Sequence, residues 1–338
     1  MTTVAINGFG RIGRLFFRQA YKNKNLKIVA VNDLGSIENL AYLLEYDSVY
    51  GRFGASVKVQ GSSLIVDGKK IEVLQEADPS KLPWKKLEVD IVIEATGVFN
   101  SYEKSQVHRK AGAKRVVITA PSKDEDTDDG KTVLVGVNEH EASTCSLTSN
   151  GSCTTNAVAA VVQVLDEAIG VEKAILTTTH GYTASQKLVD GPSGRSDVRR
   201  GRAAAQNIIP STTGAAKTVG RAIPKFKDTF DGMALRVPVI AGSIADVTLV
   251  TTKKTTEKEV NAAFEKAATL SKWEGILTTT TDPIVSTDII GEPYAAIIDL
   301  SFTKVVDGDL VKVLSWYDNE WGYVATLLRH VKAVAKNP

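Results

Sequence analysis

The chain of 338 residues has only two cysteines, Cys145 and Cys153, and four histidines. Two cysteines do not make the disulfide framework of a small secreted domain, and sparse cysteine is typical of a reducing compartment. The sequence shows neither an export signal nor an apolar run long enough to cross a bilayer. We therefore expect a cytoplasmic protein with no membrane partner.

An excess of charge of one sign is also lacking. The 41 Lys and Arg residues and the 39 Asp and Glu residues leave a formal net charge of +2. Binding to nucleic acid requires a concentrated basic patch, so we expect no specific nucleic-acid partner. Cysteine and histidine do not occur at metal-ligand spacing, so we expect no metal. A chain of this length exceeds the size at which one core usually stops growing, which favours two domains.

The first 150 residues alternate short Val- and Ile-rich runs with helical patterns. Runs without polar interruption are typical of parallel strands that are covered on both faces. We expect strands at residues 4–6, 27–31, 90–94 and 115–118, and a helix at 12–22. This alternation predicts a doubly wound α/β domain of the Rossmann type.

Beyond Cys153 the expected strands are longer and richer in threonine. They cover residues 174–179, 234–238, 245–252, 295–303 and 310–317. With helices at 257–270 and 319–334, they predict an α+β domain with a largely antiparallel or mixed sheet. We expect a first domain at residues 1–152, completed by the C-terminal helix at 319–338, and a second domain at 153–318.

A glycine-rich motif, GxGxxG, occupies residues 8–13, after the first expected strand and before the first expected helix. Gly8 would permit a tight turn, Gly10 would let the backbone approach a pyrophosphate, and Gly13 would let helix and strand pack closely. Asp33 ends the second strand, where an acid binds the ribose hydroxyls and repels a 2′-phosphate. The motif predicts NAD rather than NADP, although an ordinary βα turn and a strand-end cap at Asp33 are the alternatives.

Cys153 lies in the polar segment Ser149–Asn156, directly before an apolar run that looks helical. Unpaired N–H groups and the dipole at a helix N-terminus favour a thiolate, the reactive form of cysteine. His180 follows a strand 27 residues later, and the pair predicts covalent catalysis with a proton-handling partner. A buried structural role is the alternative for both residues, and it is our interpretation of Cys145.

Three features suit an anion. Residues 211–217 open a helix with hydroxyls that could bind phosphate, although capping alone explains such a cluster. Arg236 is a charge on a strand that is otherwise apolar, so it needs a partner. The long polar segment 181–210 carries several arginines, and a solvated surface loop is an equally good interpretation.

Six motifs in order along the chain resemble the phosphorylating glyceraldehyde-3-phosphate dehydrogenases over essentially the full length. They are Asn7–Arg14, Ser149–Asn156, Ile208–Pro210, Thr213–Lys217, Arg236–Pro238 and Trp316–Tyr323. The resemblance implies that Cys153 attacks the aldehyde carbon of glyceraldehyde 3-phosphate, that His180 takes its proton, and that hydride passes to NAD. Inorganic phosphate would then cleave the Cys153 thioester to give 1,3-bisphosphoglycerate, in a homotetramer.

The resemblance also implies two anion sites. Thr183 and Arg236 would bind the substrate phosphate. The attacking phosphate would be bound by Ser152, Thr154, Thr213 and Gly214. A loop arginine would also contribute, with Arg199 the first choice and Arg200 the alternative, because one extra residue before Thr213 blurs the match.

For NAD, the residues implied by the resemblance are those of the glycine loop, the ribose acid and three residues for the nicotinamide half. They are Gly8, Gly10, Arg11, Ile12, Gly13, Asp33, Thr119, Asn319 and Tyr323. Two other functions remain open. An erythrose-4-phosphate dehydrogenase would share the fold, thiol and cofactor but release an acid through water. A binding or adhesive protein would need no Cys153–His180 pair.

Overall fold

The structure is a computed structural model that describes residues 1–194 and 197–336, and its chain forms two compact units. The first unit comprises Met1–Val133, Asn138–Gly151 and the chain from Leu327 onwards. The second comprises Leu134–Val137 and Ser152–Thr326.

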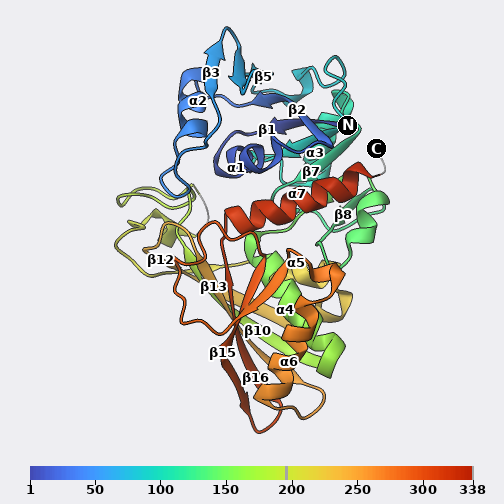
Figure 1. The fold of residues 1–338 in the computed structure, drawn as a ribbon, viewed down its shortest axis with the longest axis vertical. Coiled ribbons are helices and arrows are strands. Elements are labelled where there is room, and N and C mark those ends of the chain that lie inside the picture. The colour runs from blue at the N-terminus through green and yellow to red at the C-terminus, as the bar shows by residue number, and fades with distance from the viewer. Residues whose placement is uncertain (195–196, 337–338) are drawn as a thin grey trace. The chain divides into compact units, whose positions relative to one another are not determined.

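The first unit is built on strands that alternate with helices (Figure 1). Its strands are β1 (Thr2–Asn7), β2 (Leu26–Asn32), β3 (Val57–Gln60), β4 (Ser63–Val66), β5 (Lys69–Leu74), β6 (Ile91–Glu94), β7 (Arg115–Ile118), β8 (Gly130–Thr132) and β9 (Leu147–Ser149). Its α-helices are α1 (Arg11–Ala20), α2 (Ile37–Glu45) and α3 (Tyr102–Lys110), and its short 3₁₀ helices are Pro79–Lys81 and Glu139–Ser143.

The sheet of the first unit has the order β3-β4-β5-β2-β1-β6-β7-β9-β8. Strands β5, β2, β1, β6, β7, β9 and β8 pair in parallel. Helix α1 returns the chain from β1 to β2, so the glycine motif lies where β1 turns into a helix. The predicted Rossmann-type α/β fold is confirmed.

An antiparallel meander at one edge departs from the parallel sheet expected for this half of the chain. Strands β3, β4 and β5 pair antiparallel with their sequence neighbours. Asp67 and Gly68 join β4 to β5 with φ of 47° and 79°. Two consecutive positive φ values are the signature of a tight hairpin turn, for which Asp-Gly is a favoured pair. The sequence signal was therefore present and was overlooked.

The second unit has a mixed sheet of order β11-β12-β10-β13-β16-β15-β14, with the pairs β10–β12 and β14–β15 parallel. Its strands are β10 (Val171–Gly181), β11 (Ile209–Thr212), β12 (Phe230–Val237), β13 (Ser243–Thr251), β14 (Leu277–Thr280), β15 (Ala296–Val306) and β16 (Leu310–Tyr317). Its helices are α4 (Cys153–Ile169), α5 (Ala215–Ala222) and α6 (Glu257–Ala268), with 3₁₀ helices at Val198–Gly201, Pro224–Phe226 and Ser271–Trp273. The predicted α+β fold with a mixed sheet is confirmed.

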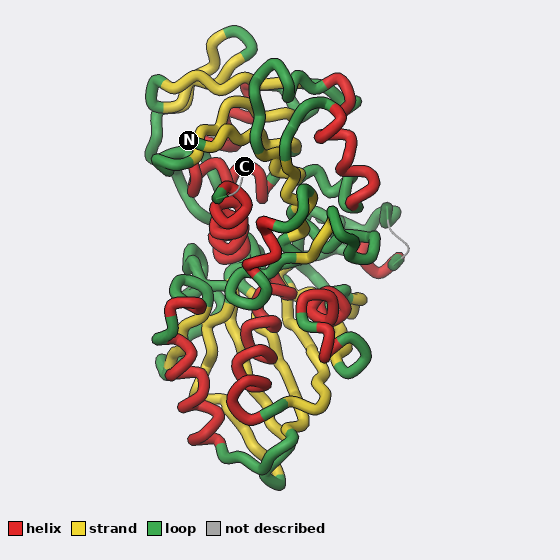
Figure 2. The backbone as a smooth tube through the Cα atoms, turned by 90° about the vertical axis from the view of Figure 1, so that its right-hand side faces the viewer, coloured by secondary structure: helices red, strands yellow, loops and turns green. Residues whose placement is uncertain are grey.

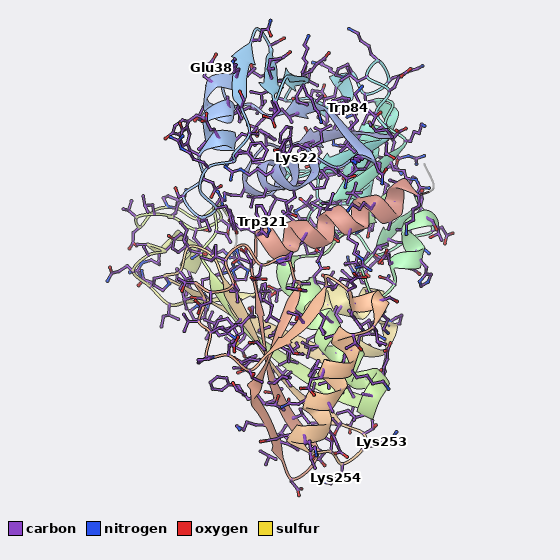
Figure 3. The ribbon with its side chains drawn as sticks, viewed as in Figure 1. Lys22, Glu38, Trp84, Lys253, Lys254 and Trp321 are labelled. Carbon is purple, nitrogen blue, oxygen red and sulfur yellow. The ribbon has the colours of Figure 1, made fainter. Side chains whose placement is uncertain are left out.

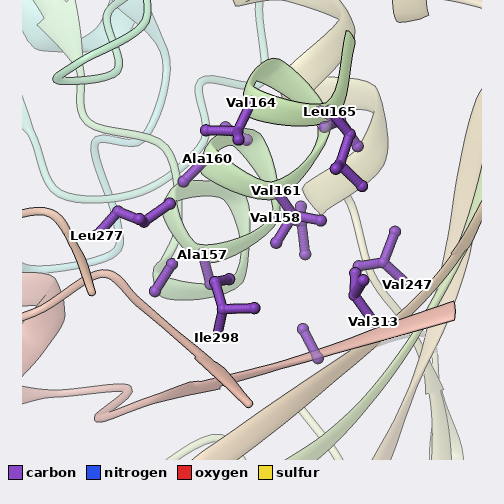
Figure 4. Packing of buried hydrophobic residues seen from close by; sticks show 14 of the residues in the cluster. Ala157, Val158, Ala160, Val161, Val164, Leu165, Val247, Leu277, Ile298 and Val313 are labelled. Atoms are coloured by element: carbon purple, nitrogen blue, oxygen red, sulfur yellow. The ribbon is translucent and has the colours of Figure 1, made fainter. Parts of the chain in front are cut away.

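Helices lie against one face of this sheet (Figure 2). The apolar run of α4 provides much of the core, because nearly every residue from Ala157 to Leu165 is buried. Figure 4 shows Val158 and Val161 of α4 directed at Val247 and Val313 of the central strands. Burial of this helix fixes the position of its first residue, Cys153.

Helix α7 (Trp321–Ala335) passes from the second unit into the first. Residues 319–326 group with the second unit, although we expected them in the first domain, and so do residues 134–137. Asn319 Oδ1 accepts hydrogen bonds from Gly242 N and Ser243 Oγ, which explains the first difference. Leu134 and Val135 join the core under α4, which explains the second.

The acidic segment 124–129 ties two parts of the first unit together. Asp126 accepts hydrogen bonds from the Tyr102 hydroxyl at 2.9 Å and from Thr132 N at 2.8 Å. Asp129 forms an ion pair with Arg109 and accepts from Ser146 N at 2.9 Å. These carboxylates therefore fasten the loop to α3 and to the strands beside it.

Among the described residues, no helix is both long and apolar enough for a membrane span.

Candidate active site

Cys153 is the first residue of α4, as its polar surroundings predicted. Ser152 caps the helix, because its hydroxyl accepts a hydrogen bond from Thr155 N at 3.0 Å. The first N–H groups of a helix have no partner within it, and they are directed toward the thiol end. The Cys153 side chain is half-buried, whereas Cys145 is buried and its pKa is raised by burial to about 11.

His180 lies near the end of β10, on the sheet face that also carries Leu176 and Thr178. Its side chain is 3% exposed, and Nε2 lies 3.4 Å from Cys153 Sγ. The structure thus brings together the two residues that the sequence pairs as nucleophile and proton acceptor.

The other ring nitrogen of His180 lies between a donor and an acceptor. Arg236 on β12 pairs in register with His180, and its Nη1 lies 2.7 Å from His180 Nδ1. The carbonyl oxygen of Gly181 is also 2.7 Å from Nδ1. A guanidinium only donates and a carbonyl only accepts, so Nδ1 can hydrogen-bond to one of them at a time.

Burial sets the protonation states of the pair. It raises the pKa of the Cys153 thiol, and the Arg236 cation and hydrogen bonds from Thr154 oppose this only in part. Burial, with the Arg236 cation next in importance, lowers the pKa of His180 to about 3. Burial therefore opposes the thiolate that the helix terminus was expected to favour. The two pKa shifts favour a thiol beside a neutral imidazole at neutral pH.

Tyr317 was missed as a site residue by our sequence reasoning. Its hydroxyl lies 2.9 Å from Thr154 Oγ1 and 2.7 Å from Thr178 Oγ1, and its ring meets the His180 ring edge-on with centroids 6.0 Å apart. Burial raises its pKa, so the phenol stays protonated. Its place in the Trp316–Tyr323 motif was the available signal.

The arginines of the loop after β10 differ sharply. Arg199, our first choice for phosphate, is exposed and pairs with Asp197 at 2.9 Å. Arg200 is buried, and its Nη1 donates to Ser185 Oγ at 2.9 Å. Ser185 Oγ in turn lies 2.9 Å from Thr183 Oγ1, so Arg200 and Thr183 share a partner. This geometry favours Arg200 over Arg199, and phosphate binding by either arginine stays a prediction.

Thr213 and Gly214 lie at the N-terminus of α5, as predicted for an anion site. Thr213 Oγ1 accepts from Ala215 N at 3.2 Å, and Gly214 is exposed at the cap position. Strand β11, which leads into this helix, pairs with β12 so that Ile209 lies opposite Arg236. By contrast, the hydroxyls of Ser152 and Thr154 are directed to Thr155 and Tyr317.

In the first unit, the backbone surroundings of Gly8 and Gly13 match the turn and the close packing that the motif predicts, and the pyrophosphate role of Gly10 stays a prediction. A Cβ at Gly8, where φ is +94°, would lie 2.6 Å from the backbone of Ala95 and Thr96. One at Gly13 would lie 2.1 Å from Gly8 O. One at Gly10 would meet no protein atom within 4 Å. Close packing requires Gly8 and Gly13, while Gly10 faces open space that a ligand could occupy.

That space is a cavity of about 360 Å³, and Gly8, Gly10 and Asp33 line it. Asp33 also accepts hydrogen bonds from Phe9 N at 2.8 Å and Gly35 N at 3.0 Å. The carboxylate therefore both borders the cavity and fastens the glycine loop. An open backbone at a helix N-terminus with an acid beside it fits a dinucleotide.

The remaining cofactor candidates lie in three places. Arg11 and Ile12 begin α1, and the Arg11 side chain forms an ion pair with Asp47. Thr119 follows β7, and its N and Oγ1 both donate to Glu94 O at 3.0 Å. Asn319 and Tyr323 are buried and belong to the second unit.

A Rossmann-type unit with a glycine-rich cradle and a second unit with a contacting thiol–imidazole pair are typical of one class, the NAD-binding oxidoreductases. Residues 2–102 match the family described as glyceraldehyde 3-phosphate dehydrogenase, NAD binding domain, and residues 152–319 match its C-terminal domain. The chain belongs to the glyceraldehyde-3-phosphate dehydrogenase family, and NAD is its cofactor.

Proteins that carry this family name are similar to the chain over nearly its whole length. The one from Thermotoga maritima is 52% identical over 326 residues, which is 96% of each chain. Glyceraldehyde-3-phosphate dehydrogenase 2 of Bacillus subtilis (strain 168) is 47% identical over 99% of this chain and 98% of its own. The Eremothecium gossypii protein is 46% identical over the full length of both.

Proposed function

We propose that the chain is the phosphorylating enzyme of glycolysis and gluconeogenesis, which converts glyceraldehyde 3-phosphate, NAD and inorganic phosphate to 1,3-bisphosphoglycerate. The observation that supports this most is the 3.4 Å contact between Cys153 Sγ and His180 Nε2, with Arg236 directly behind the imidazole. A thiol, a base and a cation in one row suit a covalent reaction on an anionic aldehyde.

The first step joins Cys153 Sγ to the aldehyde carbon while His180 Nε2 takes the thiol proton. A neutral imidazole is the form that can accept this proton, and burial keeps His180 in that form. Bound NAD supplies a hydride acceptor for the carbon–hydrogen bond. The resulting thioester keeps the oxidation energy that hydrolysis would dissipate. A phosphate oxygen then bonds to the acyl carbon as the carbon–sulfur bond breaks, and Cys153 is restored.

The substrate phosphate itself would activate His180. Arg236 competes with the Gly181 carbonyl for the Nδ1 atom of His180, and its positive charge disfavours an imidazolium. An anion that binds the guanidinium would compensate that charge and leave Nδ1 to donate to Gly181 O. The lone pair of Nε2 would then face the thiol. Base strength would thus rise when the correct substrate is present.

Two anion sites follow from the side chains around this pair. We assign the substrate phosphate to Arg236 and Thr183. We assign the attacking phosphate to Arg200 and to the N-terminus of α5 at Thr213 and Gly214. Ser152 and Thr154, at the N-terminus of α4, would also contribute to this site. The buried Arg200, the half-buried Arg236 and the N–H groups at a helix N-terminus are suited to these tasks.

We assign the adenosine half of NAD to the cavity at Gly10 and Asp33, with Gly8 and Gly13 shaping the loop and the N–H groups of Arg11 and Ile12 at the pyrophosphate. Thr119, Asn319 and Tyr323 would bind the nicotinamide half. The first unit would serve as the NAD-binding domain and the second as the catalytic domain.

We infer that the protein is a homotetramer in the cytoplasm. The sheet face of the second unit opposite α4 carries exposed apolar side chains, which a second copy could cover. They are Ile175, Met233, Phe302, Val306 and Leu310. Both cysteines are free thiols, which suits a reducing compartment.

The test follows NADH absorbance with glyceraldehyde 3-phosphate or erythrose 4-phosphate, with and without inorganic phosphate. We expect turnover of the three-carbon aldehyde that depends on phosphate or arsenate, and no turnover in Cys153→Ser. Phosphate-independent turnover, or faster oxidation of the four-carbon aldehyde, would instead identify the hydrolytic erythrose-4-phosphate dehydrogenase. Activity retained in Cys153→Ser would contradict the covalent step.

A further inference from the structure

Three buried polar side chains stand in a row at the carboxyl ends of neighbouring parallel strands. Asn32 ends β2, Asn7 ends β1 and Glu94 ends β6, and the strand register pairs Asn7 with both of the others. Each side chain is at most 6% exposed. Polar groups at such depth require hydrogen-bond partners, so the row is a built feature of the fold.

One end of the row is fixed by Trp84, which is labelled in Figure 3. Its indole N–H lies 3.1 Å from His108 Nδ1, and an indole nitrogen can only donate. His108 Nδ1 must therefore accept, and the ring proton is on Nε2. That nitrogen lies 2.9 Å from Glu94 Oε2, so His108 donates to the carboxylate.

The other end is fixed by the backbone of Glu76. Its N–H donates to Asn32 Oδ1 at 2.9 Å, and its carbonyl accepts from Asn32 Nδ2 at 2.9 Å. Asn32 Nδ2 also donates to Asn7 Oδ1 at 2.7 Å. This orients the Asn7 amide, whose Nδ2 donates to Glu94 Oε2 at 2.6 Å. Hydrogen bonds from both ends therefore converge on Glu94.

Glu94 also fixes the loop that follows its strand. Its Oε1 accepts from Thr96 N at 2.8 Å and from the Thr96 hydroxyl. The carboxylate accepts four hydrogen bonds in all, which fills the acceptor capacity of an ionised carboxyl group. Further along this loop, the Phe99 ring meets the His108 ring edge-on, with the two ring centroids 6.1 Å apart.

Several members of this chain of hydrogen bonds line the cavity that we assign to the adenosine half of NAD. Asn7, Asn32, Glu76, Thr96 and Phe99 all line it. In the sheet order β5-β2-β1-β6, Asn32 and Asn7 lie between Glu76, which follows β5, and Thr96, which follows β6. We call the lining at Glu76 and the lining at Thr96 and Phe99 the two walls of the cavity. The two walls come from segments 20 residues apart in sequence, and Glu94 connects them through one continuous set of donors and acceptors.

We propose that Glu94 and His108 are positioning residues for NAD: the acceptor-only carboxylate, oriented by His108, holds both walls of the cavity at the separation that the cofactor requires. The inference rests on the proposed cofactor site. The side-chain contacts of His108 and Glu94 include neither Cys153 Sγ nor His180 Nε2, the two atoms to which we assign the first chemical step. Their loss should therefore weaken NAD binding and leave the Cys153 chemistry intact.

Glu94→Gln is the sharpest variant because it keeps the shape and removes only the acceptor pattern. Either orientation of the amide places an NH₂ group against a donor, Thr96 N on one side or His108 Nε2 on the other. We expect its dissociation constant for NAD, measured by isothermal titration calorimetry without substrate, to rise about ten- to hundredfold. The KM for NAD should rise in parallel, with kcat at saturating NAD and the alkylation rate of Cys153 unchanged.

His108 provides a matched pair of variants. His108→Gln can still accept from Trp84 and donate to Glu94, so it should bind NAD nearly as the parent does. His108→Leu can do neither and should resemble Glu94→Gln. If Glu94→Gln does not fold, this pair carries the test. Nitrogen-15 NMR should show the His108 proton on Nε2, and a proton on Nδ1 would contradict the hydrogen-bond assignment.

His330→Leu is the control for general destabilisation, because His330 is a second buried histidine of the same unit that does not line the cavity. An equal loss of NAD affinity in His330→Leu at an equal loss of thermal stability would overturn the positioning role. Asp33→Ala separates the two proposals. If it weakens NAD binding while Glu94→Gln and His108→Leu do not, the positioning role fails and the site stands. If Asp33→Ala also binds NAD normally, the site itself is wrong.

Discussion

Arg236 and His180 face each other across neighbouring parallel strands, with Arg236 Nη1 only 2.7 Å from His180 Nδ1. The carbonyl of Gly181 lies at the same distance from this nitrogen. The protonation of the imidazole that we propose as the base is thereby linked to the position of a cation. In a catalytic site that accepts an anionic substrate, this link connects recognition of the phosphate to the strength of the base.

Arg236→Gln should separate recognition from the chemistry of the thiol. Loss of hydrogen bonds to a charged group should lower kcat/KM for glyceraldehyde 3-phosphate about 10- to 100-fold. Unphosphorylated glyceraldehyde should be oxidised no more slowly than by the parent, because it has no phosphate for Arg236 to bind and removal of the cation favours proton acceptance by His180. Removal of the cation should also raise the pKa of His180 from about 3, which NMR titration would detect. Equal losses with both aldehydes would exclude Arg236 as the phosphate ligand.

Arg200→Gln and Arg199→Gln should differ clearly. Arg200 is buried beside Ser185, whereas Arg199 is exposed and paired with Asp197. We expect Arg200→Gln to raise the KM for inorganic phosphate about tenfold or more, because a buried guanidinium makes strong hydrogen bonds to an anion. Exposed ion pairs contribute little, so Arg199→Gln should have a KM close to that of the parent. Initial rates at varied phosphate decide between the two, and the reverse ranking would restore Arg199.

Tyr317→Phe removes the hydroxyl that joins Thr154 to Thr178 behind Cys153. Buried threonine oxygens would lose a partner, so the free energy of unfolding should fall by about 1–3 kcal/mol. The urea midpoint measures this loss. Tyr42 is exposed, and Tyr42→Phe should leave the midpoint unchanged. An unchanged midpoint in Tyr317→Phe would mean that the contacts of the Tyr317 hydroxyl with Thr154 and Thr178 add no stability.

Gly10→Ala and Gly13→Ala should change different properties: the first should weaken NAD binding, and the second should lower thermal stability. A Cβ at Gly13 would lie 2.1 Å from Gly8 O, so that variant should lose thermal stability. Gly10 has φ of −74° and open space around it, so Gly10→Ala should melt like the parent. Its methyl group would occupy space in the proposed cofactor cavity and should weaken NAD binding. Normal NAD affinity in Gly10→Ala would contradict close approach of the cofactor at that residue.

The sequence was informative where a local pattern determines structure. The apolar run after Cys153 located α4, and the glycine spacing located the turn from β1 into α1. Contacts between distant segments were not accessible in this way. Tyr317 and Thr154 are separated by 163 residues, and no local pattern indicates which pair of hydroxyls will meet. The direction of the Cys153 pKa shift was also missed, because it depends on burial as well as on the helix terminus.

The choice between Arg199 and Arg200 illustrates the same limit. Neighbouring residues in a short 3₁₀ helix point in different directions, and only the fold decides which one is buried. The network around Glu94 was not predicted for a related reason. Its row of polar side chains is visible only once β2, β1 and β6 are aligned.

His330 should make the protein sensitive to acid. Burial lowers its pKa to about 4, and its ring nitrogens contact Asn150 Oδ1 at 3.0 Å and Thr148 Oγ1 at 2.7 Å. The unfolded chain binds a proton near pH 6.5, whereas the folded chain binds it only near pH 4, so stability falls as the pH drops through this window. The loss reaches about 3 kcal/mol for this group at pH 4 and is absent above pH 7.

Urea unfolding between pH 7 and pH 4 measures this dependence against two variants. His330→Gln has no titrating ring, so its stability should fall less steeply over the same window, by about the amount assigned to His330. His140 lies at the surface, and His140→Gln should retain the full slope of the parent. Acid-sensitive carboxylates and His180 contribute equally to all three proteins, so the difference between their slopes isolates His330. Parallel curves for the parent and His330→Gln would show that burial of this imidazole does not control acid stability.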